Sequence, residues 1–168
     1  MRQAQGMTLM ELLVALALLA LLAALAIPAL DGMRLNASRA ATMEGLLRAA
    51  WYARSEAGRR GRAVVLCPAG SSGACAPQRD AWGHGWTVAV ATAPDAPLRT
   101  GPGVRHARVA LLANRDAFTF ETRDRRSTNG TVAWCDPRGE AASRALVISP
   151  TGRPRLERGS GPLECERP

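Results

Sequence analysis

Residues 6–28 read Gly-Met-Thr-Leu-Met-Glu-Leu-Leu-Val-Ala-Leu-Ala-Leu-Leu-Ala-Leu-Leu-Ala-Ala-Leu-Ala-Ile-Pro. From Leu12 to Leu30 the chain carries no charged side chain, and this run of 19 residues is rich in Leu and Ala, both good helix formers. As an α-helix the run is about 28 Å long at about 1.5 Å per residue, close to the bilayer hydrocarbon thickness of about 30 Å. The stretch therefore predicts a membrane-spanning helix near the N-terminus.

One acidic residue, Glu11, stands at the N-terminal edge of this run. A carboxylate at the border of a membrane helix is costly unless it is paired or lies near the headgroups. A simple single-pass anchor does not need it, whereas a helix that packs among copies of itself can pair it with a neighbour's N-terminal ammonium. A secretory signal peptide cleaved near Ala24-Leu25-Ala26 is a further alternative, but the apolar run is longer than the usual stretch of about 7–15 residues.

The N-terminus resembles the class III leader of type IV pilins and type II secretion pseudopilins. The resemblance rests on a short leader that ends at Gly6, then Met7, the acid Glu11, the apolar run and Pro28. It implies that prepilin peptidase cleaves between Gly6 and Met7 and methylates the new N-terminus at Met7. It also assigns Glu11, the fifth residue after the cut, and Pro28 to assembly with other pilins. The family usually has Phe where this chain has Met7.

The same resemblance implies an organisation and a location. We expect a leader at 1–6, a transmembrane and filament-core helix at 7–30, an amphipathic continuation at 31–58 and a β-rich head at 59–168. The fold class is then α+β, a long N-terminal helix packed on a small antiparallel head. The chain would cross the inner membrane once with its head in the periplasm, and would be extracellular when incorporated in a pilus.

The residues after Pro28 support one long helix from about Thr8 to Ala57. Apolar residues recur at spacings near three and four, and Gly58 is typical of a helix C-terminus. The rest favours short strands, with a Pro-rich loop at 93–103 and a hairpin turn at Asn129-Gly130. The expected strands are Ala63–Cys67, Gly85–Thr92, Val104–Leu112, Ala117–Thr122, Thr131–Asp136, Ala145–Ser149 and an edge strand at Arg153–Arg158.

The chain has a formal net charge of +8, and all 22 of its basic residues are Arg. A strongly basic domain outside the cytoplasm suggests a polyanion or an anionic surface as partner, although a merely basic, soluble surface gives the same balance. The planar guanidinium fork of Arg is well suited to phosphate.

Four cysteines, all after the apolar run, favour disulfides in an exported domain. Three pairings are open to them. Cys67 and Cys75 bracket a flexible loop that can bring them together, so we pair these two and then Cys135 with Cys165. A zinc site is the alternative, but no Cys-x-x-Cys spacing is present.

The head has its own resemblance. A Leu-Cys pair ends an early strand, a second Cys follows, and Trp82-Gly83-His84-Gly85-Trp86 leads into the next strand. Cys135 follows near the end of a later strand, and Cys165 lies near the C-terminus. This arrangement of Cys and Trp residues is similar to that of the GspH/FimT family of minor pilins and minor pseudopilins. FimT-like members are linked to DNA uptake in natural transformation, and some of them carry a Gly-Arg-x-Arg motif near the C-terminus that binds DNA.

Here Gly152-Arg153-Pro154-Arg155 matches that motif, and Arg144 and Arg158 flank it. Two guanidinium groups two residues apart on an extended segment are about 6–7 Å apart and can meet neighbouring phosphates. Such contacts hold nucleic acid without reading its sequence. Few aromatic residues lie near the motif in the sequence, so we expect double-stranded DNA rather than stacked single strands. The alternative is an Arg-rich surface hairpin without a DNA role, because a chance Gly-Arg-x-Arg sequence is not rare in a chain with 22 Arg.

The sequence contains no Gly-rich phosphate loop, nucleophile elbow or metal-ligand cluster, so we predict neither an enzyme nor a cofactor. We interpret the chain as a minor type IV pilin that binds double-stranded DNA in natural transformation. The alternative is a GspH- or FimU-like subunit at the tip of a secretion pseudopilus or a pilus, without DNA binding.

Overall fold

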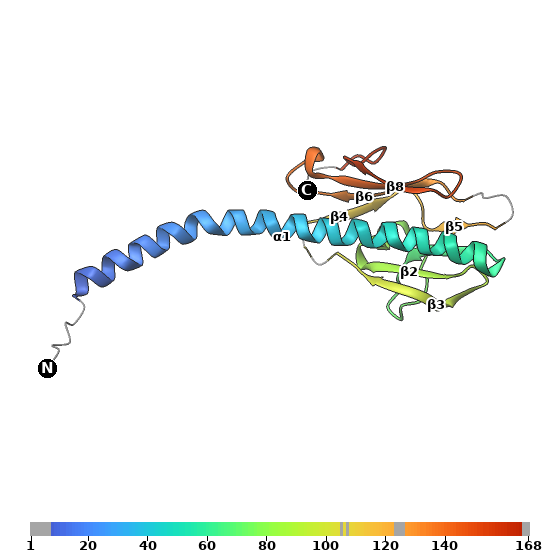
Figure 1. Cartoon of the computed structure of the whole chain (residues 1–168), viewed down its shortest axis with the longest axis horizontal. Helices are drawn as coiled ribbons and strands as arrows, with labels where there is room; N and C mark the ends of the chain where they lie inside the picture. Colours follow the sequence, from blue (N-terminus) through green and yellow to red (C-terminus); the bar gives the residue numbers. More distant parts are fainter. Residues whose placement is uncertain (1–7, 105, 107, 123–126, 166–168) are drawn as a thin grey trace. The chain divides into compact units, whose positions relative to one another are not determined.

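The computed structural model describes residues 8–104, 106, 108–122 and 127–165. Residue contacts divide the chain into two units, residues 1–37 and 38–168. Helix α1 (Leu9–Arg60) contributes to both, and the eight strands all belong to the second (Figure 1). The expected cleavage site at Gly6 and Met7 lies outside the described residues, as do Arg123–Arg126 and the side chain of Pro28.

Helix α1 begins next to Thr8, whose hydroxyl oxygen accepts a hydrogen bond of 3.3 Å from the backbone N–H of Glu11. The spacing Thr-x-x-Glu at a helix start is that of a capping box. Glu11 also lies in the first turn, where a carboxylate interacts favourably with the helix dipole. The residue therefore has a local role in starting the helix, whatever it does in assembly.

The apolar part of α1 exposes its side chains within residues 9–37. Leu9 is 77% exposed, Leu25 69% and Leu22 63%. An 18-residue window of this helix has a mean hydropathy of 2.8, and by length and composition the helix can span a membrane. So much exposed Leu requires apolar surroundings, which a bilayer or other helices provide.

The end of α1 differs from the sequence expectation, which placed the stop at Gly58. The helix continues to Arg60, and Gly61 then takes a left-handed backbone angle of φ 64°. The Gly61 N–H donates to the Ala57 carbonyl at 3.1 Å, which is the αL capping motif. Glycine is needed where φ turns positive, and that position is Gly61 rather than Gly58.

Two antiparallel four-stranded sheets form the head, which confirms the α+β class. In the first sheet the strand order is β3-β2-β1-β5, and in the second it is β4-β6-β7-β8. The strands are β1 (Val64–Pro68), β2 (Gly85–Val90), β3 (Ala93–Pro102), β4 (Ala110–Ala113), β5 (Phe118–Phe120), β6 (Gly130–Cys135), β7 (Arg144–Ile148) and β8 (Pro154–Arg158). Two short 3-10 helices, Arg79–His84 and Glu140–Ala142, connect them.

The expected loop at 93–103 is wrong, because most of it is strand β3. Strand β3 lies at a sheet edge and pairs only with β2, with an irregular register between Val88 and Val90. Proline is tolerated on an edge strand because its missing N–H can face solvent. The expected strand at Val104–Leu112 is shorter than predicted and begins at Ala110.

The expected hairpin turn at Asn129-Gly130 is also wrong. Strand β5 pairs with β1 in the first sheet, whereas β6 belongs to the second, so the chain changes sheets here. Gly130 is instead required by close packing. A Cβ at this position would lie 2.5 Å from Oδ1 of Asn114 and 2.7 Å from Cγ of Arg115.

One hydrophobic core joins the second half of α1 to both sheets. The helix contributes four alanines, Ala49, Ala50, Ala53 and Ala57, all at most 1% exposed, together with the larger Met43 and Leu46. The sheets and the first 3-10 helix contribute most of the large side chains. These include Trp82, Trp86, Phe118, Phe120, Val132, Trp134 and Leu146.

Two disulfides fasten the loops of the head. Cys67 is bonded to Cys75, and Cys135 at the end of β6 is bonded to Cys165 near the C-terminus. The pairing that the short loop favoured is the one in the structure. No free cysteine remains.

We predict that Gly101→Ala destabilises the head. A Cβ at Gly101 would lie 2.2 Å from the ring of Trp86, a side chain that is only 7% exposed. Overpacking of this kind costs about 1–3 kcal/mol. The free energy of unfolding of the full chain in non-ionic detergent, measured in urea by near-UV circular dichroism, tests this.

The matched control is Gly58→Ala, because nothing lies within 4 Å of a Cβ there and the residue is helical. Replacing a helical Gly with Ala is expected to be neutral or stabilising by up to about 1 kcal/mol. Equal stability of Gly101→Ala and wild type would contradict the close packing.

Candidate nucleic-acid interface

The turn between β7 and β8 positions the Gly-Arg-Pro-Arg motif. The Gly152 N–H donates to the Ser149 carbonyl at 2.8 Å, and the Ser149 N–H donates to the Arg153 carbonyl at 3.1 Å. Gly152 is buried with φ 72°, and a Cβ there would lie 3.0 Å from Cβ of Ser127. The motif glycine therefore fits a tight, left-handed turn that other residues adopt at a cost.

Arg153 and Arg155 are both exposed, and Pro154 between them is buried. This alternation is that of an extended segment whose odd-numbered side chains point away from the core. Arg155 is not free of partners, because its Nε donates to Oε1 of Glu157 at 2.5 Å. The motif thus presents the guanidinium groups of Arg153 and Arg155, and the Glu157 carboxylate neutralises part of the charge of Arg155.

The structure separates the two flanking arginines from the motif. Strand β8 is the edge of its sheet, and Arg158 pairs directly opposite Arg144 on β7. Because side chains alternate along a strand, Arg158 lies on the sheet face opposite to that of Arg155. Nη1 of Arg144 donates to the Ser143 carbonyl at 2.7 Å. The four arginines predicted to contact DNA therefore form two pairs at opposite ends of β8.

An aromatic residue missed by the sequence interpretation lies beside the motif. Trp51 on α1 is 44% exposed and lines a hollow of about 510 Å³ together with Ser149, Arg153, Pro154 and Arg155. Arg54 lies one turn further along the helix, with its guanidinium carbon 5.8 Å from the centre of the Trp51 ring. The available signal was the helix period, since Trp51 falls outside the buried stripe through Ala50, Ala53 and Ala57.

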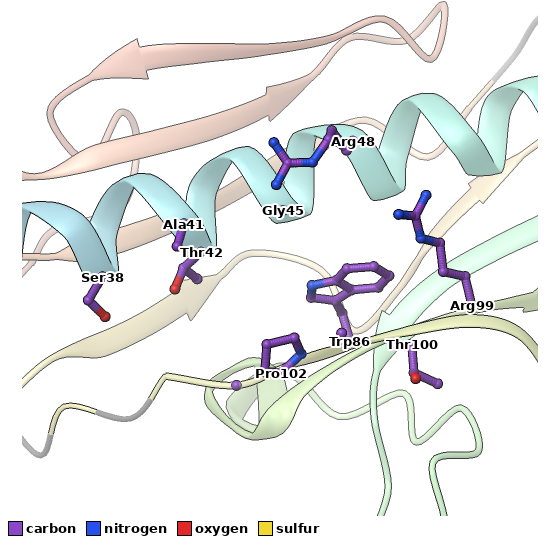
Figure 2. A pocket seen from close by; sticks show the side chains of 11 residues that line it. Ser38, Ala41, Thr42, Gly45, Arg48, Trp86, Arg99, Thr100 and Pro102 are labelled. Carbon is purple, nitrogen blue, oxygen red and sulfur yellow. The ribbon is translucent and has the colours of Figure 1, made fainter.

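A second hollow, of about 410 Å³, lies between α1 and strand β3 (Figure 2). Trp86 is at its centre, and Arg48 and Arg99 flank it from the helix and the strand. Arg48 pairs with Glu44 at 3.4 Å, and Arg99 lies over the ring of Tyr52 at 5.5 Å. None of the residues that the sequence singled out for DNA contact lines this hollow. Among the described residues no cluster of His, Cys, Asp and Glu is arranged to hold a metal ion.

Comparison with known proteins identifies the family. The model of the family "Type II transport protein GspH" matches residues 42–152, and the prokaryotic N-terminal methylation motif matches residues 1–27. The chain belongs to the GspH family. It is thus a type IV pilin-like protein of the GspH/FimT group, and the family consists of structural pilin subunits rather than enzymes.

Two crystal structures of the type IV minor pilin FimU from Pseudomonas aeruginosa are similar to this GspH-family chain. The first is 29% identical, with a TM-score of 0.58, and the match covers 76% of this chain and 95% of FimU. The second is 28% identical, with a TM-score of 0.57, and covers 75% and 98%. No curated protein sequence matches the chain.

The similarity to pilins supports membrane anchoring by the apolar helix, incorporation into a pilus, contact with other pilins and processing by prepilin peptidase.

The GspH-family head also contains a buried ion network near Arg144. The Asp136 side chain is fully buried and accepts hydrogen bonds from Arg138, and Nη1 of Arg39 on α1 lies 3.7 Å from its Oδ2. Hydrogen bonds from Arg138 hold the pKa of Asp136 below its usual range, although burial acts in the opposite direction. Nη1 of Arg39 also donates to the Ala142 carbonyl, so this network fastens the helix to the loop after β6.

We predict that Asp136→Asn removes part of the acid sensitivity of the head. A carboxyl with a lowered folded pKa stabilises the fold above its unfolded pKa, near 3.9, and this stabilisation is lost as pH falls through the folded pKa. The free energy of unfolding of wild type should therefore decline more steeply below about pH 4 than that of the variant. At neutral pH the variant should be less stable by about 1–3 kcal/mol. Urea titrations over a pH series measure both effects.

Asp116→Asn is the control, because Asp116 is exposed and its partner Arg79 is 3.5 Å away. Its effect should stay below about 1 kcal/mol at every pH. Parallel pH profiles for wild type and Asp136→Asn would contradict the role of this network.

Proposed function

We propose that this minor pilin binds double-stranded DNA through the phosphate backbone at Gly152–Arg155 and supports DNA uptake in natural transformation. The observation that carries the proposal is the turn at Gly152, which exposes Arg153 and Arg155 on either side of a buried Pro154. The formal charge of +8 adds long-range attraction for a polyanion. Arg144 and Arg158 add positive charge at the far end of β8 and assist only where DNA follows the sheet edge.

The proposal includes the processing and placement of the chain. Prepilin peptidase cleaves between Gly6 and Met7 and methylates Met7, and Glu11 and Pro28 serve assembly. Residues 7–30 form the transmembrane and filament-core helix, 31–58 its amphipathic continuation and 59–168 the head. The head lies in the periplasm while the helix is in the inner membrane, and becomes extracellular in the pilus.

A second candidate is a pilus-priming or pseudopilus-tip subunit without a DNA role. The similarity to FimU, a minor pilin, over three quarters of this chain favours it. The property that separates the two candidates by experiment is the binding of DNA by the exposed arginines.

We predict that Arg153→Ala/Arg155→Ala weakens binding to duplex DNA and reduces its salt dependence. Each phosphate contact contributes about 0.9 to the slope of log K against log salt concentration, so the loss of two contacts should flatten the slope by about 1.8. Fluorescence anisotropy of a labelled duplex, with the full chain in non-ionic detergent micelles at several salt concentrations, measures it.

Arg79→Ala/Arg99→Ala is the matched control, since it removes two exposed positive charges away from the motif. It should change the affinity far less. Equal losses in both variants would indicate attraction by net charge alone and would move the contact away from the motif. If wild type binds no duplex at low salt, the subunit role without DNA remains.

We predict that Glu157→Gln strengthens duplex binding. Glu157 pairs with Arg155 and places a negative charge beside the expected phosphate path. Its removal frees the guanidinium and should raise the affinity about twofold to fivefold, as for a surface interaction of about 0.5–1 kcal/mol. The same anisotropy titration measures the change.

Glu164→Gln makes the same change of charge at an exposed residue outside β8 and should have a smaller effect. A weaker or unchanged affinity in Glu157→Gln would contradict a phosphate contact at Arg155.

A further inference from the structure

Trp51 differs from the other large aromatic side chains of the head. Trp82, Trp86 and Trp134 are at most 7% exposed, whereas Trp51 is 44% exposed. Among the described residues of 38–168, the one other large apolar side chain with comparable exposure is Leu156, at 37%. An exposed Trp on a helix whose neighbouring face is fully buried contributes little to the core, so a surface role accounts for it better than packing does.

The surroundings of Trp51 carry positive charge. Its hollow is lined by Arg153 and Arg155, and no acidic residue is among the lining residues. Arg54 places its guanidinium near the ring, and Nη1 of Arg54 is buried without a hydrogen-bond partner. Arg54 also lines a smaller hollow, of about 180 Å³, with Thr151 and Gly152 of the motif turn and with the acidic Glu121. The helix therefore brings one aromatic ring and one further cation alongside the motif.

A ligand that satisfies this surface has to carry negative charge and a flat apolar group at short spacing. Nucleic acid with unpaired bases has both, since each nucleotide provides a phosphate and a base with a π-face. Within an intact duplex the base faces are stacked on each other, so a protein reaches the phosphates and the base edges but not the π-faces. Base stacking was not expected because few aromatic residues are near the motif in the sequence. The fold, however, places Trp51 beside the motif, so an aromatic ring is available for stacking with a base.

We propose that Trp51 stacks on an unpaired base while Arg153 and Arg155 hold the adjoining phosphates, so that the site prefers a DNA end with a single-stranded overhang to a blunt duplex. The inference rests on the proposed DNA binding and adds a specificity to it. Trp51 lies on α1, whereas Arg153 and Arg155 lie at the sheet edge formed by β8. The bound DNA strand therefore crosses that sheet edge. The contact reads no base sequence, because every base offers a π-face.

The test compares three labelled probes on the full chain in non-ionic detergent micelles. They are a blunt duplex, the same duplex with a short single-stranded overhang, and that overhang with abasic sites, which keeps the phosphates and removes the bases. Wild type should bind the overhang about fivefold to a hundredfold more tightly than the blunt duplex, the range for stacking one base on an aromatic side chain. The abasic overhang should give much less of this gain.

Trp51→Ala should lose the base-dependent gain and keep its affinity for the blunt duplex, whereas Trp51→Phe should retain part of the gain. Leu156→Ala removes the other exposed large apolar side chain and should behave as wild type. An equal gain from abasic and normal overhangs, or a gain that persists in Trp51→Ala, would overturn the inference. So would an equal weakening of all three probes in Trp51→Ala, which is expected if Trp51 only supports the fold or contacts a neighbouring subunit.

Failure of this inference is distinguishable from failure of the proposed function. If wild type binds the blunt duplex through Arg153 and Arg155 but gains nothing from the overhang, DNA binding stands and the base contact falls. If wild type binds none of the three probes, both fall.

Discussion

The head depends on a stripe of alanines along the second half of α1. Ala49, Ala50, Ala53 and Ala57 are almost completely buried, and their small side chains let the sheets approach the helix backbone closely. Most of the large side chains come from the opposite side, where Trp82 and Phe118 lie with ring centres 5.5 Å apart. Large groups facing small ones fill the core at the density that protein interiors require. One helix can thereby serve as the common packing surface of two separate sheets.

This arrangement has a consequence for the edges of the sheets. Each sheet packs one face on the shared core and has two outer strands, β3 and β5 in one sheet and β4 and β8 in the other. Two of these edge strands contain prolines, Pro94, Pro97 and Pro102 in β3 and Pro154 in β8, which reduces the number of exposed N–H groups available to another chain. The exposed arginine motif lies at the start of one of these protected edges.

The same helix links the core to the candidate interface. Its buried stripe fixes the rotation of α1, and that rotation turns Trp51 and Arg54 toward the hollows beside the β7–β8 turn. Trp51 contributes little to packing itself, but the fully buried residues next to it on the helix hold it in place. The ion network at Asp136 fixes the helix at the other end of β8, through Arg39. The position of Trp51 relative to Arg153 thus follows from contacts distributed along the helix.

The sequence by itself determined the elements whose signals are local. The uncharged Leu and Ala run predicted the helix, alternation predicted most of the strands, and Pro154 predicted an edge strand, because each depends on residues adjacent in the chain. It also gave the family, through the leader pattern and the arrangement of Cys and Trp residues. What only the tertiary structure decided involves contacts between distant segments. Strand β3 forms despite its prolines because β2 pairs with it, and Gly130 is a packing glycine rather than a hairpin turn because Asn114 and Arg115 lie against it. Trp51 lies beside Arg153, whereas Arg144 lies at the other end of β8. Both positions depend on the sheet register and the helix rotation, which the whole core sets and no short stretch of sequence encodes.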